Sequence, residues 1–431
     1  MGETRGTLPP LQWLEVITKS MSLSVPRRMS REEWTVLLLL SASAFLNYFD
    51  RITLSVAATD IQREFHITNT ELGSLHSAFF AAYAICQISF LSGWVVGRFN
   101  VGWVLAWGFF LWTCATAATG LMHVFAVIIV LRVVLGIGES VSYPSYSRIL
   151  ASSFPEHHRG LANALIDAAT KAAPAAGTLL GGLLVARYGW RPFFFALGAS
   201  TLVWLVPWIR SMPRGVLAAR EDGTLVPSIG AILRQRSMWF AAIGQFCANY
   251  FWYFLMTWLP AYLEKERHFP KPKMALFAWL PFLAIALAGV ISGWASDRLI
   301  ERGYSVTLVR KTFAGVGMAG SVLVIAVAMV RSDTAAIAIL TVACAIYGIY
   351  ASQLFAIVQA IAGPHASGKW TSFQNGFANF AGILAPWLTG VVLDATGQFF
   401  YAFLLAGLIA VAGAANWVLG LGRIEQVKFS K

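Results

Sequence analysis

Six ionisable residues lie inside long apolar stretches of this chain, where a charge is costly. Three are acids and three are bases, and all belong to the first half of the sequence: Asp50, Arg51, Arg132, Glu139, Asp167 and Lys171. Inserting one such charge into a membrane costs roughly 2.5 to 3.5 kcal/mol, so six unpaired charges would cost on the order of 15 kcal/mol or more. We therefore expect these side chains to face a shared cavity and to form pairs there.

Helical periodicity groups most of these charges on two faces. One face repeats at intervals of four, three and four residues: Arg132, Gly136, Glu139 and Tyr143. The other places an acid four residues before a base: Asn163, Asp167 and Lys171. Residues three or four apart in a helix are neighbours, so both faces are predicted to point into the cavity. A structural role is the alternative, because ion pairs also hold helices together, and for Lys171 with Asp167 both roles fit.

Uncharged polar residues could complete a binding site. The second half supplies amides on one predicted helix: Gln374, Asn375 and Asn379. Amide groups both donate and accept hydrogen bonds, so they suit hydroxyl groups, although bonds between helices are a common alternative. Tyr48 and Tyr83 lie mid-span near the charges, where a phenol hydroxyl can bind a carboxylate or simply pack in the core.

An all-α membrane protein of about twelve transmembrane helices is predicted to position these residues. Of the 431 residues, 58% are hydrophobic and only 12% are charged, and the mean hydropathy is +0.65. Apolar stretches of about 20 residues recur from Trp34 to Gly420, and each is long enough to cross a bilayer as a helix. Water cannot be the main solvent of such a chain.

The apolar stretches form two blocks of six, separated by a polar gap. We predict a cytoplasmic tail, a six-helix bundle, a cytoplasmic linker, a second six-helix bundle and a second tail, at residues 1–33, 34–212, 213–236, 237–421 and 422–431. A Gly-Trp pair at 93–94, followed by Arg98, recurs about 200 residues later at 293–294, followed by Arg298. Such an echo is typical of duplicated halves. Residues 1–28 are interpreted as an extension without function.

The distribution of charge predicts location and excludes several functions. The formal net charge is +12, but the basic residues lie in short loops rather than along one stripe, which argues against a nucleic-acid partner. Their excess on one side of the spans predicts a multi-pass inner (plasma) membrane protein with both termini in the cytoplasm. We expect it to be a monomer in the membrane lipid. No metal-site, nucleophile-elbow or phosphate-loop motif occurs, so we predict no cofactor and no enzymatic activity.

Several segments carry a more specific pattern. They are residues 47–51 (Asn-Tyr-Phe-Asp-Arg), Arg132 to Glu139 with Pro144, and residues 154–160 (Phe-Pro-Glu-His-His-Arg-Gly), 257–263 (Thr-Trp-Leu-Pro-Ala-Tyr-Leu) and 293–298 (Gly-Trp-Ala-Ser-Asp-Arg). Together with the two blocks of six helices, they resemble the major facilitator superfamily and, within it, the anion:cation symporter family. That family includes bacterial proton symporters of sugar acids, animal sialin and the vesicular glutamate transporters.

The resemblance implies roles for individual residues. Arg51 matches the position that binds the substrate carboxylate, while Asp50 and Glu139 match the acids that take up coupling protons. Tyr83 and Asn379 match positions that line the substrate. A guanidinium offers a planar fork to a carboxylate, and an acid in an apolar cavity can hold a proton, so the chemistry agrees.

The chain also departs from the family pattern. Gly97 stands where the first gating loop usually has an aspartate, whereas the equivalent second loop keeps Asp297 and Arg298, which predicts helix-end clamping on one side. Lys171 replaces a small or amide residue. It is either a second cation for a dianion or a neutralising partner for Asp167.

These features predict a secondary transporter that works by alternating access. We expect proton-coupled symport of a small organic anion, namely a sugar acid such as a hexonate or hexuronate, or a dicarboxylate. Proton-driven export or uniport of another small molecule is the main alternative. A membrane enzyme or receptor is a remote one.

Overall fold

The structure, a computed structural model, describes residues 29–89, 91–212 and 227–427, and these are helical almost throughout. The helices of the first half are α2 (Arg31–Phe65), α3 (Asn69–Ile88), α4 (Leu91–Arg98), α5 (Val101–Thr119), α6 (Phe125–Ser140), α7 (Ser142–Ser153), α8 (Glu156–Ala176), η1 (Gly177–Gly181), α9 (Gly182–Tyr188), α10 (Trp190–Thr201), η2 (Leu202–Trp204) and α11 (Leu205–Ser211).

The second half continues the same pattern. Its helices are α12 (Ile229–Leu233), α13 (Arg236–Lys265), α14 (Lys271–Glu301), α15 (Val306–Gly320), η3 (Ser321–Leu323), α16 (Val324–Met329), α17 (Asp333–Ala351), α18 (Gln353–Ala378), α19 (Phe380–Thr396), α20 (Phe399–Ala415) and η4 (Asn416–Gly420). Most of the predicted linker, residues 213–226, and residues 1–28 of the predicted tail lie outside the described residues.

Local sequence explains where helices begin and where they break. Capping boxes, in which a hydroxyl and a glutamate satisfy the free backbone N–H groups reciprocally, start α2 at Ser30 and α3 at Thr68. Pro144 cannot donate a backbone hydrogen bond, and α6 gives way to α7 just before it. Within α18, Gly363 has a φ of 67°, which permits a sharp kink that a residue with a side chain would resist.

The predicted all-α membrane fold is confirmed. Within residues 29–89, 91–212 and 227–427, ten helical segments are long and apolar enough to cross a membrane, and the bent pair α3 and α4, at 59°, makes an eleventh. The thirty-residue α13 is also long enough to cross a membrane, but its tyrosines, tryptophans and amides make it less apolar than these segments. No β-strand occurs in the part of the chain that the structure describes.

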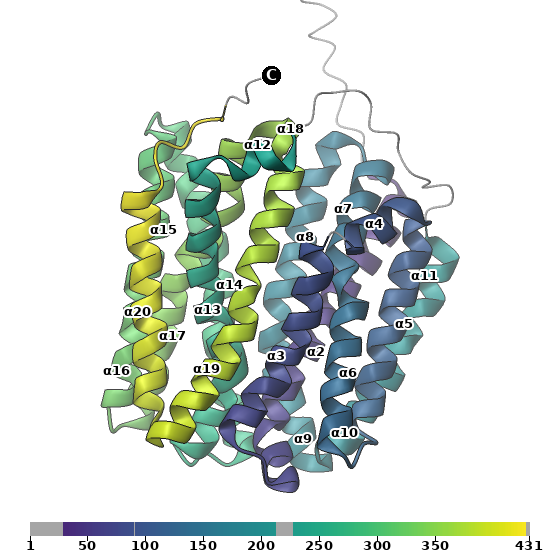
Figure 1. The fold of residues 1–431 in the computed structure, drawn as a ribbon, viewed down its shortest axis with the longest axis vertical. Helices are drawn as coiled ribbons and strands as arrows, with labels where there is room; N and C mark the ends of the chain where they lie inside the picture. Colours follow the sequence, from purple (N-terminus) through teal and green to yellow (C-terminus); the bar gives the residue numbers. More distant parts are fainter. Residues whose placement is uncertain (1–28, 90, 213–226, 428–431) are drawn as a thin grey trace, which may run out of the picture.

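Two helical bundles stand side by side. Figure 1 shows the purple and blue helices of the first half on one side and the green and yellow helices of the second half on the other. The halves meet where α3 packs on α19, α8 on α14 and α2 on α13. We call the end of the molecule where α2 ends at Phe65 and α3 begins at Asn69 the far end. The C-terminal tail lies at the opposite end (Figure 1).

Glycines allow several of these helices to approach closely. A Cβ at Gly136 of α6 would lie 2.4 Å from the carbonyl oxygen of Phe79 in α3, well inside contact distance. At the boundary between the halves, a Cβ at Gly73 of α3 would lie 2.4 Å from the carbonyl oxygen of Pro386 in α19. Small residues at such crossings are a common device of membrane helices.

Gly136→Leu is expected to destabilise the first bundle. The new side chain must push α3 away from α6, and overpacking of this kind costs about 1 to 3 kcal/mol. The measurement is the thermal unfolding midpoint in detergent, which should fall by several degrees. Gly93→Ala is the control, because a Cβ there meets nothing within 4 Å. An unchanged midpoint in Gly136→Leu would show that this crossing yields easily.

Candidate functional site

A buried ion pair lies at the centre of the first bundle. Arg51 of α2 donates its Nε–H to Oε2 of Glu139 in α6 at 2.8 Å. The two side chains are 4% and 0% exposed. Two polar atoms of the pair, Nη2 of Arg51 and Oε1 of Glu139, have no hydrogen-bond partner among the described residues. The pair therefore retains one donor and one acceptor that a ligand or a proton can occupy.

Aromatic rings surround the guanidinium. Its central carbon lies 4.8 Å from the ring centre of Tyr48, 4.9 Å from that of Phe79 and 4.9 Å from that of Tyr83. The Tyr143 hydroxyl donates a hydrogen bond to that of Tyr48 at 3.4 Å, which extends the aromatic wall to α7. A cation over ring faces is stabilised by their quadrupoles without being neutralised, so Arg51 keeps its charge available for an anion.

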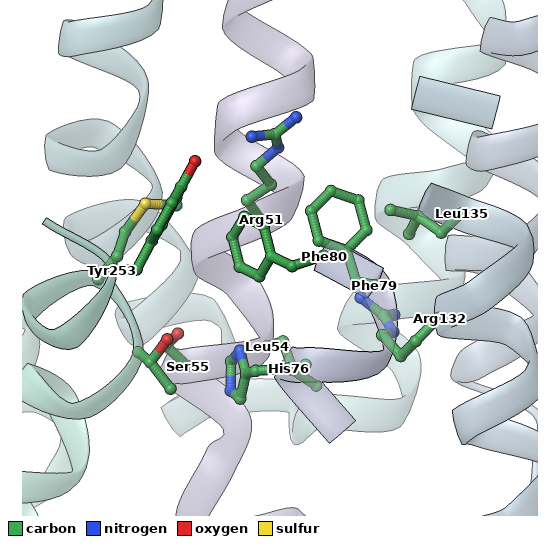
Figure 2. A pocket seen from close by; sticks show the side chains of 11 residues that line it. Arg51, Leu54, Ser55, His76, Phe79, Phe80, Arg132, Leu135 and Tyr253 are labelled. Atoms are coloured by element: carbon green, nitrogen blue, oxygen red, sulfur yellow. The ribbon is translucent and has the colours of Figure 1, made fainter. Parts of the chain in front are cut away.

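A cavity opens beside Arg51 at the boundary between the halves (Figure 2). Its walls come from both bundles: Arg51, Leu54, Ser55, His76, Phe79, Phe80, Arg132, Leu135, Tyr253, Met256 and Thr257. The open space is only about 20 Å³, enough for one water molecule but not for a sugar acid. The side chains around Arg51 are thus closed on one another in this conformation.

Asp50 and Arg132 differ from the expectation that every charge is paired with another. Oδ2 of Asp50 accepts a hydrogen bond from the Thr116 hydroxyl at 2.5 Å, and Nη2 of Arg132 donates to the Thr119 hydroxyl at 3.1 Å. No carboxylate lies within 4.0 Å of the Arg132 nitrogens in the described part of the chain. The reason is geometric, because both side chains turn towards threonines of α5 rather than towards each other. Both are nevertheless almost fully buried.

The second predicted pair is loose. Nζ of Lys171 lies 3.9 Å from Oδ1 of Asp167, and the two side chains are 34% and 60% exposed. The ammonium also lies 5.6 Å from the ring centre of Trp252 in α13. Lys171 therefore contacts the second bundle, whereas Arg51 and Glu139 belong to the core of the first.

The predicted amide residues bond mainly to one another. Gln374 donates to Oε1 of Gln245 at 2.8 Å, and Gln245 donates to Oδ1 of Asn375 at 3.1 Å. Oδ1 of Asn379 accepts a hydrogen bond from the Tyr253 hydroxyl at 2.6 Å. Tyr253 also lines the cavity beside Arg51, so Asn379 is the amide that connects most directly to that cavity.

The loop residues Asp297 and Arg298 take different partners. Oδ1 of Asp297 accepts from Nη2 of Arg310 at 2.7 Å, whereas Arg298 is 58% exposed and lies 3.8 Å from Glu301. Arg310 also donates to Gln353, so it joins α14, α15 and α18. Arg310 is not among the residues predicted from the sequence, although its position near the start of the helix after the loop was a usable signal.

His76 is a second residue of the site that the sequence did not predict. This side chain is 5% exposed, lines the cavity, and its Nε2 has no hydrogen-bond partner among the described residues. Its spacing of seven residues from Tyr83 puts both on one face of α3 and could have indicated its place. Figure 2 shows it beside Ser55, on the opposite side of the cavity from the Arg51 guanidinium.

Several known proteins with similar sequences are named as transporters of sugar acids or other anions. The chain is 32% identical to a probable galactarate/D-glucarate transporter of Pseudomonas putida, over 86% of this chain and 87% of that protein. It is 28% identical to a hexuronate transporter of Bacillus subtilis, over 89% of this chain and 93% of that protein. These relatives are transporters and not enzymes.

The fold has a close counterpart among solved structures. A bacterial homologue of the human lysosomal transporter Spinster, in an inward-facing and occupied conformation, superimposes with a TM-score of 0.75. The match covers 91% of this chain and 97% of that one at 17% identity, so it concerns the fold alone. Residues 40–360 also match the family model of these carriers, and the chain belongs to the Major Facilitator Superfamily of membrane transporters.

Proposed function

We propose that the protein is a proton-coupled symporter of a small organic anion, a sugar acid such as a hexonate or hexuronate, or a dicarboxylate. The observation that carries this proposal is the caged guanidinium of Arg51, which is buried, paired with Glu139 and left with an unused Nη2. An arginine stays charged in such a place and offers a planar fork that fits a carboxylate. The names of the relatives, which are transporters of sugar acids, support the same class of substrate.

Coupling follows from competition for Arg51. While Glu139 is ionised, it occupies the guanidinium; once protonated, it releases the guanidinium to an incoming carboxylate. Proton and anion then favour each other, and linkage requires that anion binding raises proton affinity by the same free energy. Asp50, buried beside Thr116, is the second acid that can take part.

Alternating access requires that one side of the protein opens while the other is closed. At the far end, polar contacts between the two halves can close the protein. Nζ of Lys271 in the second half lies 2.9 Å from Asp60 in the first half and 3.4 Å from Glu264 in its own half. Glu264 in turn accepts a hydrogen bond from the Thr59 hydroxyl at 2.5 Å. Lys265 donates to Gln62 and to Asn69. These bonds join α2 and α3 to α13 and α14.

Asp394 adds a helix cap supplied by the other half. Its carboxylate, near the end of α19, accepts four hydrogen bonds of 2.6 to 3.0 Å from the backbone and side chains of Asn69 and Thr70. These residues form the first turn of α3, whose free N–H groups and dipole favour a negative charge. We propose that both termini lie in the cytoplasm and that the protein spans the inner (plasma) membrane. The far end, which is opposite to the C-terminal end, then faces outside. A contact that closes it stabilises the inward-facing state.

Asp394→Asn is expected to weaken the contact between the halves at the far end. The new amide N–H₂ would face the N–H and O–H groups that now donate hydrogen bonds to the carboxylate. The population with separated halves should rise at least threefold. Spin labels at exposed Arg63 and Gln398, one in each half, would report this as a longer distance in pulsed dipolar measurements. Asp333→Asn is the control, since Asp333 pairs with Lys273 within the second half. Equal distance distributions in both variants would contradict the sealing role.

The proposed function is tested by uptake into proteoliposomes. A labelled panel of sugar acids and dicarboxylates is offered with and without a pH gradient, acid outside. Accumulation of at least one anion above its equilibrium level, only with the gradient, is the expected result. Uptake that ignores the gradient would favour uniport, and uptake of no organic anion would overturn the substrate class while leaving the fold untouched.

A further inference from the structure

A second cation, Lys171, lies where the first half meets α13 of the second half, and the coupling mechanism does not use it. Lys171 of α8 is one-third exposed, and its only carboxylate partner in the described part of the chain, Asp167, lies 3.9 Å away, near the limit of an ion pair. No hydrogen bond to its Nζ is found among the described residues. An ammonium has three donors and is strongly hydrated, so this one is free to bind a further anionic group.

Lys171 and Arg51 both lie next to α13 of the second half. Lys171 contacts Trp252 of α13, and the next residue, Tyr253, lines the cavity that contains Arg51. On the side of α7, Tyr143 bonds to Tyr48 and extends the aromatic cage of Arg51. Aromatic side chains therefore separate the two cations, and no other acid pairs directly with Lys171 in the described residues.

This arrangement has a consequence for the charge of the ligand. A monoanion bound at Arg51 leaves Lys171 with only the loosely held Asp167, which is itself 60% exposed. A ligand with a carboxylate at each end would place one charge at the Arg51 guanidinium and the other at the Lys171 ammonium. The Trp252 ring, whose centre lies 5.6 Å from the ammonium, attracts it through its quadrupole and restricts its position.

We propose that Lys171 binds the second carboxylate of a dicarboxylic sugar acid and so makes the protein selective for dianions over monoanions of the same length. This inference rests on the proposed function, in which Arg51 binds the first carboxylate. It names Lys171 as the residue that determines specificity and dianionic sugar acids as the substrate class.

The test compares galactarate with galactonate, which share six carbons and the same hydroxyl configuration but differ in whether carbon 6 is a carboxylate. Uptake of each labelled anion into proteoliposomes is measured at neutral pH, where both are fully ionised. Wild type should have at least a tenfold lower KM for galactarate. Lys171→Gln should raise the KM for galactarate at least tenfold and that for galactonate less than threefold, whereas Lys171→Arg should keep the preference.

A double variant separates substrate binding from simple neutralisation of Asp167. If Lys171 only balances Asp167, then Asp167→Asn with Lys171→Gln removes both charges and should restore the wild-type preference. If Lys171 binds the second carboxylate, the double variant still lacks the preference for galactarate over galactonate. Lys273→Gln removes a lysine that pairs with Asp333 within the second half, and it should leave both KM values unchanged.

Failure of this inference differs from failure of the proposed function. Equal KM values for the two anions in wild type, or an equal effect of Lys171→Gln on both, would overturn the role of Lys171 while proton-coupled uptake remained. Absence of uptake of every organic anion of the panel, or uptake that does not depend on Arg51, would overturn both. The wild-type comparison alone decides the matter if a Lys171 variant fails to fold.

Discussion

Arg51→Gln is expected to raise the KM for organic-anion uptake by about 100-fold or to abolish uptake. Removing one member of a buried charge pair typically costs 2 to 5 kcal/mol, which corresponds to roughly 30- to 5000-fold in affinity. Glutamine offers neither the charge nor the two-pronged geometry of the guanidinium. It also leaves Glu139, which is fully buried, without its ion-pair partner. Initial uptake rates in proteoliposomes over a range of anion concentrations measure the effect.

Two further variants give this result its meaning. Arg51→Lys keeps the charge but loses the fork, so we expect an intermediate loss of about tenfold. Arg187→Gln removes an arginine that lies exposed at the end of α9, against Tyr188, and should leave uptake unchanged. If Arg51→Gln bound and accumulated the organic anion as the wild type does, Arg51 would not be the residue that binds the carboxylate.

Glu139→Gln is expected to separate transport from its driving force. Glutamine has nearly the shape of a protonated glutamic acid, so the Arg51 fork stays available to the anion, but the side chain can no longer release or take up a proton. We expect accumulation driven by a pH gradient to fall at least tenfold, while exchange of external for internal anion continues. Counterflow and gradient-driven uptake in the same vesicles measure the two activities.

The matched control is Glu425→Gln. Glu425 is 71% exposed near the C-terminus and lies 4.0 Å from Arg423, so its replacement should change neither accumulation nor exchange. If Glu139→Gln still accumulated the anion with the gradient, the coupling proton would have to bind elsewhere. Asp50, the other buried acid of the first bundle, would then become the candidate.

The contrast between the two ion pairs has a mechanistic meaning. Arg51 and Glu139 are buried and hydrogen-bonded, so any change in their pairing is large in free energy and suits an obligatory step. Lys171 and Asp167 are partly exposed and not hydrogen-bonded, so their pairing is weak and easily replaced. The first pair thus fits coupling, which must be all or none, and the second fits selection among ligands.

The class of fold could be predicted from the sequence because the signals behind it are local. Apolar length predicts a membrane span, and a period of about four residues predicts which residues share a helix face. The same two signals pointed to the six intramembrane charges and to the amides of the second half. They suffice to predict an all-α membrane protein with a polar interior, since neither depends on how the helices are arranged.

Only the tertiary structure decided which partner each polar residue takes. Arg51 and Glu139 are 88 residues apart and meet only through the packing of the first bundle, whereas Asp50, the residue before Arg51, points to Thr116 of α5. Asp394 caps a helix 324 residues earlier in the chain. Helix rotation and approach are set by packing between distant segments, including close crossings such as that at Gly136. A local pattern carries no information about that packing, and for this reason the cap at Asp394 became visible only in the folded molecule.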